Sequence, residues 1–139
     1  MRNSEPILLV EDDRVDMMTA KRALKDLKIT NALVHSANGE EALVYLRDES
    51  SENPCVILLD LNMPRMNGIE FLKIVKVDTL LKKIPVIVLT TSDNEKDIIE
   101  SFELGVAGYM VKPPDYKNFV EVIRAVNLYW TYSKSPNKV

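Results

Sequence analysis

The chain has 139 residues, of which 46% are hydrophobic and 28% are charged, and its formal net charge is −3. This length and composition predict one globular domain with a sizeable core, and the acidic balance excludes the basic surface that nucleic-acid binding requires. The single Cys55 excludes an internal disulfide and a cysteine-based zinc site. No stretch approaches the ~20 apolar residues of a membrane span, and the first residues do not resemble a signal peptide, so the expected location is the cytoplasm.

Short apolar runs alternate along the chain with longer segments of helical periodicity. The runs predict strands at residues 7–10, 32–35, 56–59, 85–89 and 109–111. Those at 56–59 and 85–89 are uninterrupted, which is typical of strands buried on both faces of a parallel sheet.

Five helices are predicted between and after these strands. The first starts near Arg14 and the next three cover residues 39–47, 68–77 and 94–104. The last has apolar residues at i, i+3, i+4 and i+7, namely Phe119, Val122, Ile123 and Val126. Single helices between strands require parallel crossover connections. The pattern therefore predicts a three-layer, doubly wound (βα)5 domain with a five-stranded parallel sheet, whose core spans about 5–130 and whose C-terminal tail is 131–139.

Polar residues follow four of the predicted strands. They are Glu11-Asp12-Asp13, Asp60, Thr90-Thr91 and Lys112-Pro113. Because the carboxyl ends of parallel strands meet at one edge of a sheet, these side chains should gather there. Crowded carboxylates repel one another unless a cation is present, and an all-oxygen set of two or three carboxylates favours Mg²⁺. Either Asp12 or Asp13 could instead cap the helix near Arg14.

A carboxylate beside Mg²⁺, an ammonium and a hydroxyl is suited to accept a phosphoryl group. In order and spacing, the segments at 9–13 (LVEDD), 58–64 (LLDLNMP) and 66–68 (MNG), with Thr90, Tyr109 and Lys112-Pro113, resemble the CheY-like response-regulator receiver domains of two-component systems. The resemblance covers roughly residues 5–130. It implies a sheet order of 2-1-3-4-5 and no enzymatic activity beyond the domain's own phosphorylation and dephosphorylation.

The resemblance also implies roles for individual residues. Asp60 would be phosphorylated by a sensor histidine kinase or a phosphotransfer protein. Mg²⁺ would be held by Asp12, Asp13, Asp60 and the backbone carbonyl of Asn62.

The remaining implied roles concern the fourth and fifth strands. Lys112 would pair with phosphoryl oxygens, Thr90 would hydrogen-bond one of them, and Tyr109 would be an aromatic switch behind Thr90. The Lys112–Pro113 peptide bond would be cis. The family usually has Ala or Gly where this chain has Thr91, which would narrow the entrance to Asp60. The Thr-Thr-Ser run at 90–92, the doubled proline at 113–114 and the aromatic residues at 129–132 are similar to output-less regulators associated with phytochrome-type sensor kinases.

Two other functions fit the pattern less well or remain open. Aspartyl-phosphate phosphatases usually carry an Asp-x-Asp pair on the first strand, whereas Asp60 follows the third strand and Asn62 stands where the second Asp would be. A pseudo-receiver that binds partners without phosphorylation remains an alternative.

The chain ends about a dozen residues after the last core position of the final helix, which predicts a stand-alone regulator that signals through its own surface. Val120, Leu128, Tyr129 and Trp130 add apolar area beyond one helical stripe, which predicts a homodimer through the face of the fourth helix, fifth strand and fifth helix, with Trp130 as an anchor. The alternative is that Trp130 and Tyr132 cover the molecule's own edge.

Overall fold

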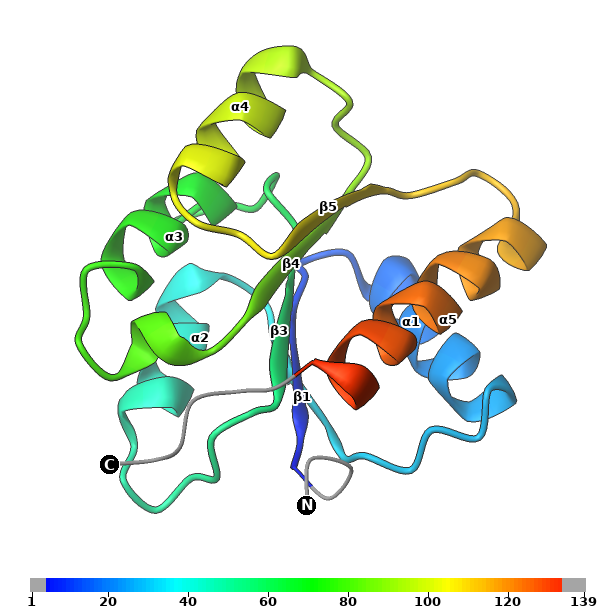
Figure 1. Cartoon of the computed structure of the whole chain (residues 1–139), viewed down its shortest axis with the longest axis horizontal. Helices are drawn as coiled ribbons and strands as arrows, with labels where there is room; N and C mark the ends of the chain where they lie inside the picture. Colours follow the sequence, from blue (N-terminus) through cyan, green and yellow to red (C-terminus); the bar gives the residue numbers. More distant parts are fainter. Residues whose placement is uncertain (1–4, 134–139) are drawn as a thin grey trace.

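The computed structural model describes residues 5–133 and contains a five-stranded parallel sheet between two layers of helices (Figure 1). The strands are β1 (Ile7–Val10), β2 (Leu33–Ser36), β3 (Val56–Leu59), β4 (Val86–Thr90) and β5 (Gly108–Val111). The helices are α1 (Arg14–Asp26), α2 (Gly39–Arg47), α3 (Gly68–Val75), α4 (Glu95–Glu103) and α5 (Tyr116–Tyr132), with a short 3₁₀ helix at Leu81–Lys83. The sheet order β2-β1-β3-β4-β5 confirms the predicted fold class.

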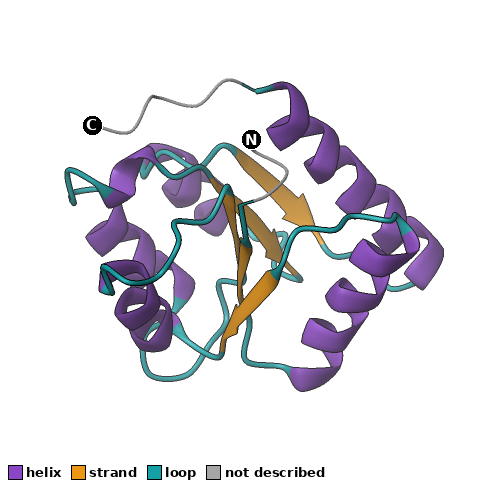
Figure 2. Cartoon of the chain, turned by 90° about the horizontal axis from the view of Figure 1, so that it is seen from below, coloured by secondary structure: helices purple, strands orange, loops and turns teal. Residues whose placement is uncertain are grey.

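Helices cover both faces of the sheet, as Figure 2 shows. Alternate residues of a strand point to opposite faces, and here both sets are apolar, so each face needs a layer of helices to bury it. On β1, Ile7 and Leu9 face a core cluster shared with α1 and α5, whereas Leu8 and Val10 face a second cluster shared with α2 and α3. All four side chains are at most 2% exposed. Burial on both faces leaves the strand ends as the part of the sheet where polar groups can gather.

Each of the five α-helices begins at an Asp or Asn side chain that accepts a backbone hydrogen bond. The N-caps are Asp13, Asn38, Asn67, Asn94 and Asp115. Such caps satisfy amide groups that the first helical turn leaves without partners, and they fix where each loop ends. The loops at the carboxyl edge are therefore defined by local sequence.

The C-terminal part of the fold differs from the prediction in two respects. Helix α5 continues to Tyr132, so the expected tail at 131–139 begins too early, and residues 134–139 of it lie outside the described residues. Trp130 is 2% exposed and packs in the cluster under α1 and α5. Its predicted role as a dimer anchor is therefore wrong, because its ring already fills the molecule's own core. Tyr132, by contrast, is 78% exposed.

None of the helices within residues 5–133 has the length and apolarity that crossing a bilayer requires.

Candidate functional site

Asp60 directly follows β3 at the carboxyl edge of the sheet and is 6% exposed. Its Oδ1 atom is buried and has no hydrogen-bond partner among the residues that the structure describes. A buried carboxylate oxygen without a donor is costly, because it has lost water and gained nothing in return. This atom is therefore the point at which a cation or an incoming group would be stabilised.

Three carboxylates meet at this edge. Glu11, Asp12 and Asp60 each offer an oxygen, and the three oxygens lie within 4.8 Å of one another. Glu11 is 2% exposed, whereas Asp12 is exposed. A small group of oxygen donors with one member open to solvent is the type of site that Mg²⁺ occupies, since this ion retains several water ligands. The donor set therefore fits the predicted Mg²⁺.

Asp13 is the exception among the predicted ligands. Its Oδ1 accepts a hydrogen bond from the backbone N–H of Asp16 at 3.0 Å, so it caps α1. The structure brings Glu11, and not Asp13, together with Asp12 and Asp60. The physical reason is that Glu11 continues directly from β1 at the sheet edge, whereas Asp13 lies where the chain has already turned into the helix. The structure therefore does not place Asp13 with Asp12 and Asp60, and it places Glu11 there instead.

Lys112 reaches this acidic cluster from the end of β5. Its Nζ atom lies 2.5 Å from Oε1 of Glu11 and 2.9 Å from Oδ2 of Asp16, and its side chain is 9% exposed. Burial acts to lower the pKa of the Lys112 ammonium, but the hydrogen bonds that it donates to Glu11 and Asp16, with the charges of Glu11 and Asp60, raise this pKa above its usual value. The ammonium therefore remains protonated beside the cluster.

Burial is also the main influence on Glu11. It raises the pKa of the Glu11 carboxyl to about 7, and the charge of Asp60 acts in the same direction, while the hydrogen bond from Lys112 acts against both. Near neutral pH, in the absence of a metal ion, the cluster can thus hold a proton on Glu11.

The Lys112–Pro113 peptide bond is trans, and the described residues contain no cis peptide. The predicted cis bond is therefore wrong. A bond before proline has an intrinsic trans preference of about 0.5–1 kcal/mol. In the trans form, the Lys112 N–H donates to the Thr90 carbonyl at 2.7 Å, which extends the β4–β5 pairing to the edge. The resemblance suggested the cis form, but no local feature of this loop requires it.

Thr90 and Tyr109, the two predicted switch residues, share a neighbour. Thr90 is fully buried, and its Oγ1 accepts a hydrogen bond from the Ser92 N–H at 3.4 Å. Tyr109 is half-buried, and its hydroxyl donates to the Ser92 carbonyl at 2.8 Å. Both side chains are thus hydrogen-bonded to Ser92 in the loop between β4 and α4. A movement of Thr90 that displaces Ser92 would therefore also change the hydrogen bond of Tyr109.

The loop after Asp60 folds back closely on the strand end. The Gly68 N–H donates to the Leu61 carbonyl at 3.0 Å. A Cβ atom on Gly68 would lie 2.6 Å from the Asp60 carbonyl oxygen and 2.7 Å from Leu61 Cα, distances that no real Cβ tolerates. Only glycine permits this approach. Asn62 in the same loop is exposed, and the role of its carbonyl as a metal ligand remains a prediction.

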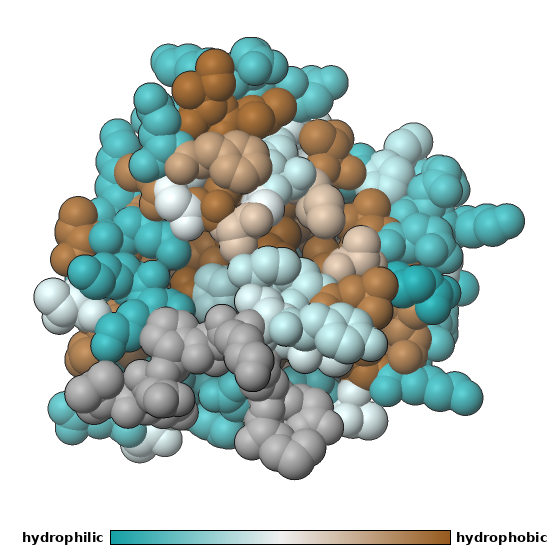
Figure 3. All heavy atoms as spheres, viewed as in Figure 1, coloured by the Kyte–Doolittle hydropathy of each residue, from teal (hydrophilic) through white to brown (hydrophobic). Residues whose placement is uncertain are grey.

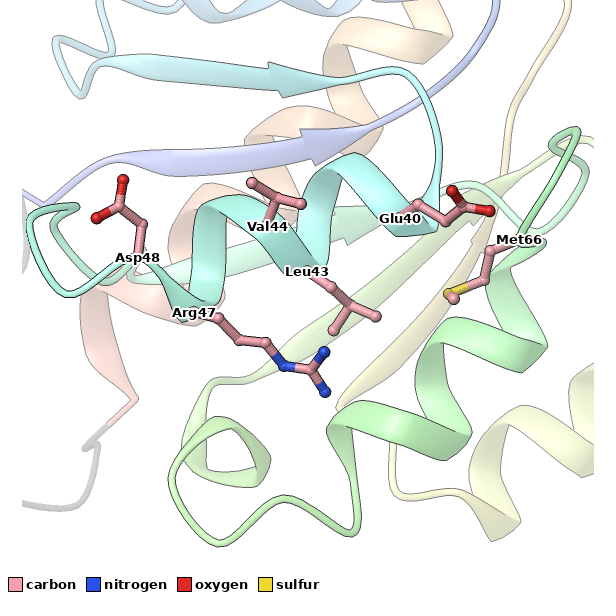
Figure 4. Close-up of a pocket in the computed structure, with 6 residues that line it drawn as sticks. All are labelled: Glu40, Leu43, Val44, Arg47, Asp48 and Met66. Carbon is pink, nitrogen blue, oxygen red and sulfur yellow. The ribbon is translucent and has the colours of Figure 1, made fainter.

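The surface has one hollow beside α1 and another along α2. One, of about 500 Å³, lies between α1 and the β5–α5 connection and is lined by Asp16, Thr91, Lys112 and Tyr116 among others. The exposed Thr91 thus borders this groove. The other hollow lies along α2, with Glu40 and Met66 at one end of it and Arg47 and Asp48 at the other (Figure 4). None of the three carboxylates of the acidic cluster lines either hollow, but Lys112, which pairs with Glu11, lines the first groove.

Sequence reasoning missed two residues that the structure places at the site. Glu11 was noted only as part of the acidic segment, although its position immediately after β1 marks it as a strand-end residue. Asp16 was not singled out. Its only sequence signal was its place in the first turn of α1, which by itself indicates a favourable interaction with the helix dipole.

Comparison with known proteins agrees with this geometry. A family model described as response regulator receiver domain matches residues 7–124. The response regulator Rcp1 of Synechocystis is 39% identical over 128 residues, which cover 89% of this chain and 87% of that protein.

Two solved structures are similar over almost the whole chain. The phosphorylated cyanobacterial phytochrome response regulator RcpA has a TM-score of 0.90 and 35% identity, covering 96% of this chain and 99% of that chain. The Mn²⁺-bound form of response regulator Rcp1 has a TM-score of 0.87 and 37% identity, with the same coverage. The chain thus belongs to the response regulator receiver domain family, within the two-component signalling proteins of CheY-like fold.

Proposed function

We propose that Asp60 accepts a phosphoryl group from a sensor histidine kinase or a phosphotransfer protein, and that the domain signals through the resulting change at its surface. The observation that carries this proposal is the buried Oδ1 of Asp60, which has no hydrogen-bond partner among the described residues and adjoins the acidic cluster. A metal ion and a phosphoryl group would together supply the interactions that this oxygen lacks.

Glu11, Asp12 and Asp60 would hold Mg²⁺, with the Asn62 carbonyl as the further predicted ligand. When bound, Mg²⁺ would neutralise charge on the carboxylates and on the transferring phosphoryl group. The nearby Lys112 ammonium provides a second positive charge that belongs to the chain itself. The similarity to the Mn²⁺-bound form of Rcp1 supports the proposal that this chain binds a divalent cation.

The chemical step is an in-line displacement at phosphorus. An Asp60 carboxylate oxygen forms the new O–P bond while the P–N bond to the donor histidine breaks, and the imidazole leaves with the electron pair of that bond. The Lys112 ammonium and the Thr90 hydroxyl would then donate hydrogen bonds to phosphoryl oxygens. If Thr90 moves to do so, it leaves its contact with the Ser92 N–H, and the β4–α4 loop and Tyr109 respond.

We further infer that the phosphoryl donor is a phytochrome-type sensor kinase. This inference rests on the similarity to RcpA, which is described as a phytochrome response regulator, over 96% of this chain. The doubled proline and the aromatic C-terminal residues noted in the sequence support the same branch.

The decisive experiment is to offer histidine kinases and Mg²⁺ to the protein and to measure phosphoryl incorporation by intact-protein mass spectrometry. One base-labile phosphoryl group is expected on the parent protein. The Asp60→Asn variant should incorporate none, and the matched control Asp93→Asn, at an exposed carboxylate of the β4–α4 loop, should behave as the parent. Absence of incorporation with every kinase and with acetyl phosphate would favour the pseudo-receiver.

A homodimer remains a second proposal, with different contacts from those first expected. Apolar side chains are exposed on α4 (Ile99 and Phe102), β5 (Val111) and α5 (Leu128, Tyr129 and Tyr132). Figure 3 shows brown and tan side chains gathered over α4 and β5, bordered by hydrophilic ones. An exposed apolar patch of this kind marks an interaction site, and a second copy in two-fold symmetry gives the simplest closed assembly.

Light scattering at micromolar concentration, with and without beryllium fluoride, tests this dimer. Phe102→Ser, which changes an exposed residue of α4, should reduce the dimer fraction. Val77→Ser, at a residue that is 80% exposed just after α3, is the control and should not. A monomer under both conditions would contradict the proposal.

A further inference from the structure

Asp16 contacts Lys112 at the candidate site, although it is not one of the three carboxylates of the acidic cluster. It lies in the first turn of α1, and its Oδ2 is 2.9 Å from the Lys112 ammonium. The same ammonium lies 2.5 Å from Oε1 of Glu11. Lys112 is therefore shared between a cluster member and a helix residue, at the point where α1 approaches the end of β5.

The two carboxylates hold Lys112 in unequal environments. The side chain of Glu11 is 3% exposed, whereas that of Asp16 is 40% exposed. An ion pair that is open to water is weak, because solvent screens it and replaces it at little cost, while a buried pair is costly to break. The Asp16 contact is thus the one that Lys112 can exchange for a new partner.

A phosphoryl group on Asp60 would be such a partner. It carries between one and two negative charges and three strong acceptor oxygens, which compete directly for an ammonium. The negative charge of Asp60 already interacts with the Lys112 ammonium, since it helps to raise the pKa of that group. An increase in negative charge at Asp60 therefore draws Lys112 away from the exposed carboxylate first.

We propose that Asp16 is a positioning residue that holds the Lys112 ammonium against α1 in the unphosphorylated protein and releases it when Asp60 is phosphorylated. This inference deepens the proposed function, on which its second half rests. Release frees the Asp16 carboxylate at the groove that Val15, Thr91, Lys112 and Tyr116 also line. Phosphorylation thus changes the charge distribution of the surface between α1 and the β5–α5 connection, without requiring a change of the sheet.

The first half is tested in the metal-free protein by NMR of the lysine side-chain ammonium groups. In the parent protein, the Lys112 ammonium should exchange its hydrogens with water slowly, because both carboxylates hold it. Asp16→Asn keeps the shape of the side chain and removes its charge, and it should accelerate this exchange by about two- to fivefold, as expected for loss of a partly exposed ion pair. Unchanged exchange in Asp16→Asn would overturn the proposal whether or not the protein is phosphorylated.

The second half is tested by titration with beryllium fluoride in the presence of Mg²⁺. If Asp16 competes for Lys112, then Asp16→Asn should lower the apparent Kd by about two- to fivefold. The control Asp93→Asn removes one negative charge from the β4–α4 loop and should change the Kd by less than about twofold, because screening weakens distant exposed charges.

A double-mutant comparison separates positioning from general charge. In the Lys112→Ala background, the Asp16→Asn substitution should leave the beryllium fluoride affinity unchanged, because Asp16 acts through Lys112. An equal effect with and without Lys112 would show that Asp16 acts only as a charge, and the positioning role would be rejected. Failure of the parent to bind beryllium fluoride would instead contradict the proposed function, and the ammonium exchange measurement would still decide the contact with Asp16.

Discussion

The Lys112 ammonium and the Glu11 carboxylate meet at 2.5 Å although 101 positions separate the two residues in the chain. Glu11 follows β1 and Lys112 follows β5, and the sheet order places β3 and β4 between these two strands. The ion pair therefore spans the carboxyl edge of the sheet, and Asp60 follows the strand next to β1. A negative charge added to Asp60 would therefore lie between the ends of β1 and β5, which the Lys112–Glu11 pair connects.

The identity of the metal ligands gives the first prediction. Glu11→Gln and Asp12→Asn should each weaken Mg²⁺ binding by at least about tenfold, because each removes a carboxylate from a site with few protein ligands. Asp13→Asn should retain the parent affinity within about twofold, since asparagine caps a helix as well as aspartate does. Isothermal titration with MgCl₂ measures all three. Loss of binding in Asp13→Asn with retention in Glu11→Gln would restore the ligand pair that the resemblance implied.

The protonation of Glu11 predicts how stability depends on pH. In the metal-free folded protein, burial raises the pKa of the Glu11 carboxyl to about 7, above its ordinary value of 4.5. The folded state therefore binds more protons than the unfolded state between these values, and the free energy of unfolding should fall as pH rises from about 4.5 to about 7.

The expected contribution of Glu11 to this fall is on the order of 1–3 kcal/mol. Urea denaturation at a series of pH values measures it, and Glu11→Gln should remove most of the slope. Added Mg²⁺ binds the ionised carboxylate, so it should stabilise the protein more at pH 7.5 than at pH 5. A parent protein with the same pH slope as Glu11→Gln would contradict the prediction.

The loop beside Asp60 predicts an effect of Gly68. In Gly68→Ala the new methyl group would meet the Asp60 carbonyl oxygen at 2.6 Å, so the loop must shift, at a cost of about 1–3 kcal/mol. Phosphorylation should slow as well, because the shift moves Asp60. In the control Gly108→Ala the nearest atom, Ile87 Cγ2, is 3.8 Å away, an ordinary contact, and both stability and phosphorylation should be close to those of the parent. Equal behaviour of the two variants would show that the loop has room to adjust.

Burial of Trp130 predicts that α5 depends on this residue. Trp130→Ala should lower the free energy of unfolding by about 3–5 kcal/mol, as expected for truncating a large buried aromatic side chain. Leu128→Ala, two positions earlier and 51% exposed, should change it by less than about 0.5 kcal/mol. Chemical denaturation followed by circular dichroism compares them. A mild effect of Trp130→Ala would mean that the indole is not part of the core.

Much of the fold follows from signals within a few residues of one another. Helix α2 begins and ends at the predicted residues, 39 and 47, because Asn38 caps its start and Asp48 follows its last turn. Apolar runs predicted β1 and β3 with the observed bounds. Asp60 was identified because a strand that is buried on both faces can present a carboxylate only at its end. Such features depend on local backbone preferences and on hydrophobic periodicity, which the sequence contains directly.

What only the tertiary structure decided concerns side chains that meet across the fold. The sequence by itself determined that several acidic residues follow β1, but not that Glu11 turns to Asp60 while Asp13 caps α1. The sequence also identified Trp130 as a large apolar side chain that must be buried. Whether the protein's own core or a second copy would bury it depended on the path of α5 over the sheet. The partners of Lys112 were likewise undetermined, since Asp16 and Glu11 lie 96 and 101 positions away. Contacts between distant segments are set by how the whole chain packs, and a single carboxylate carries no local signal of which cation it will meet.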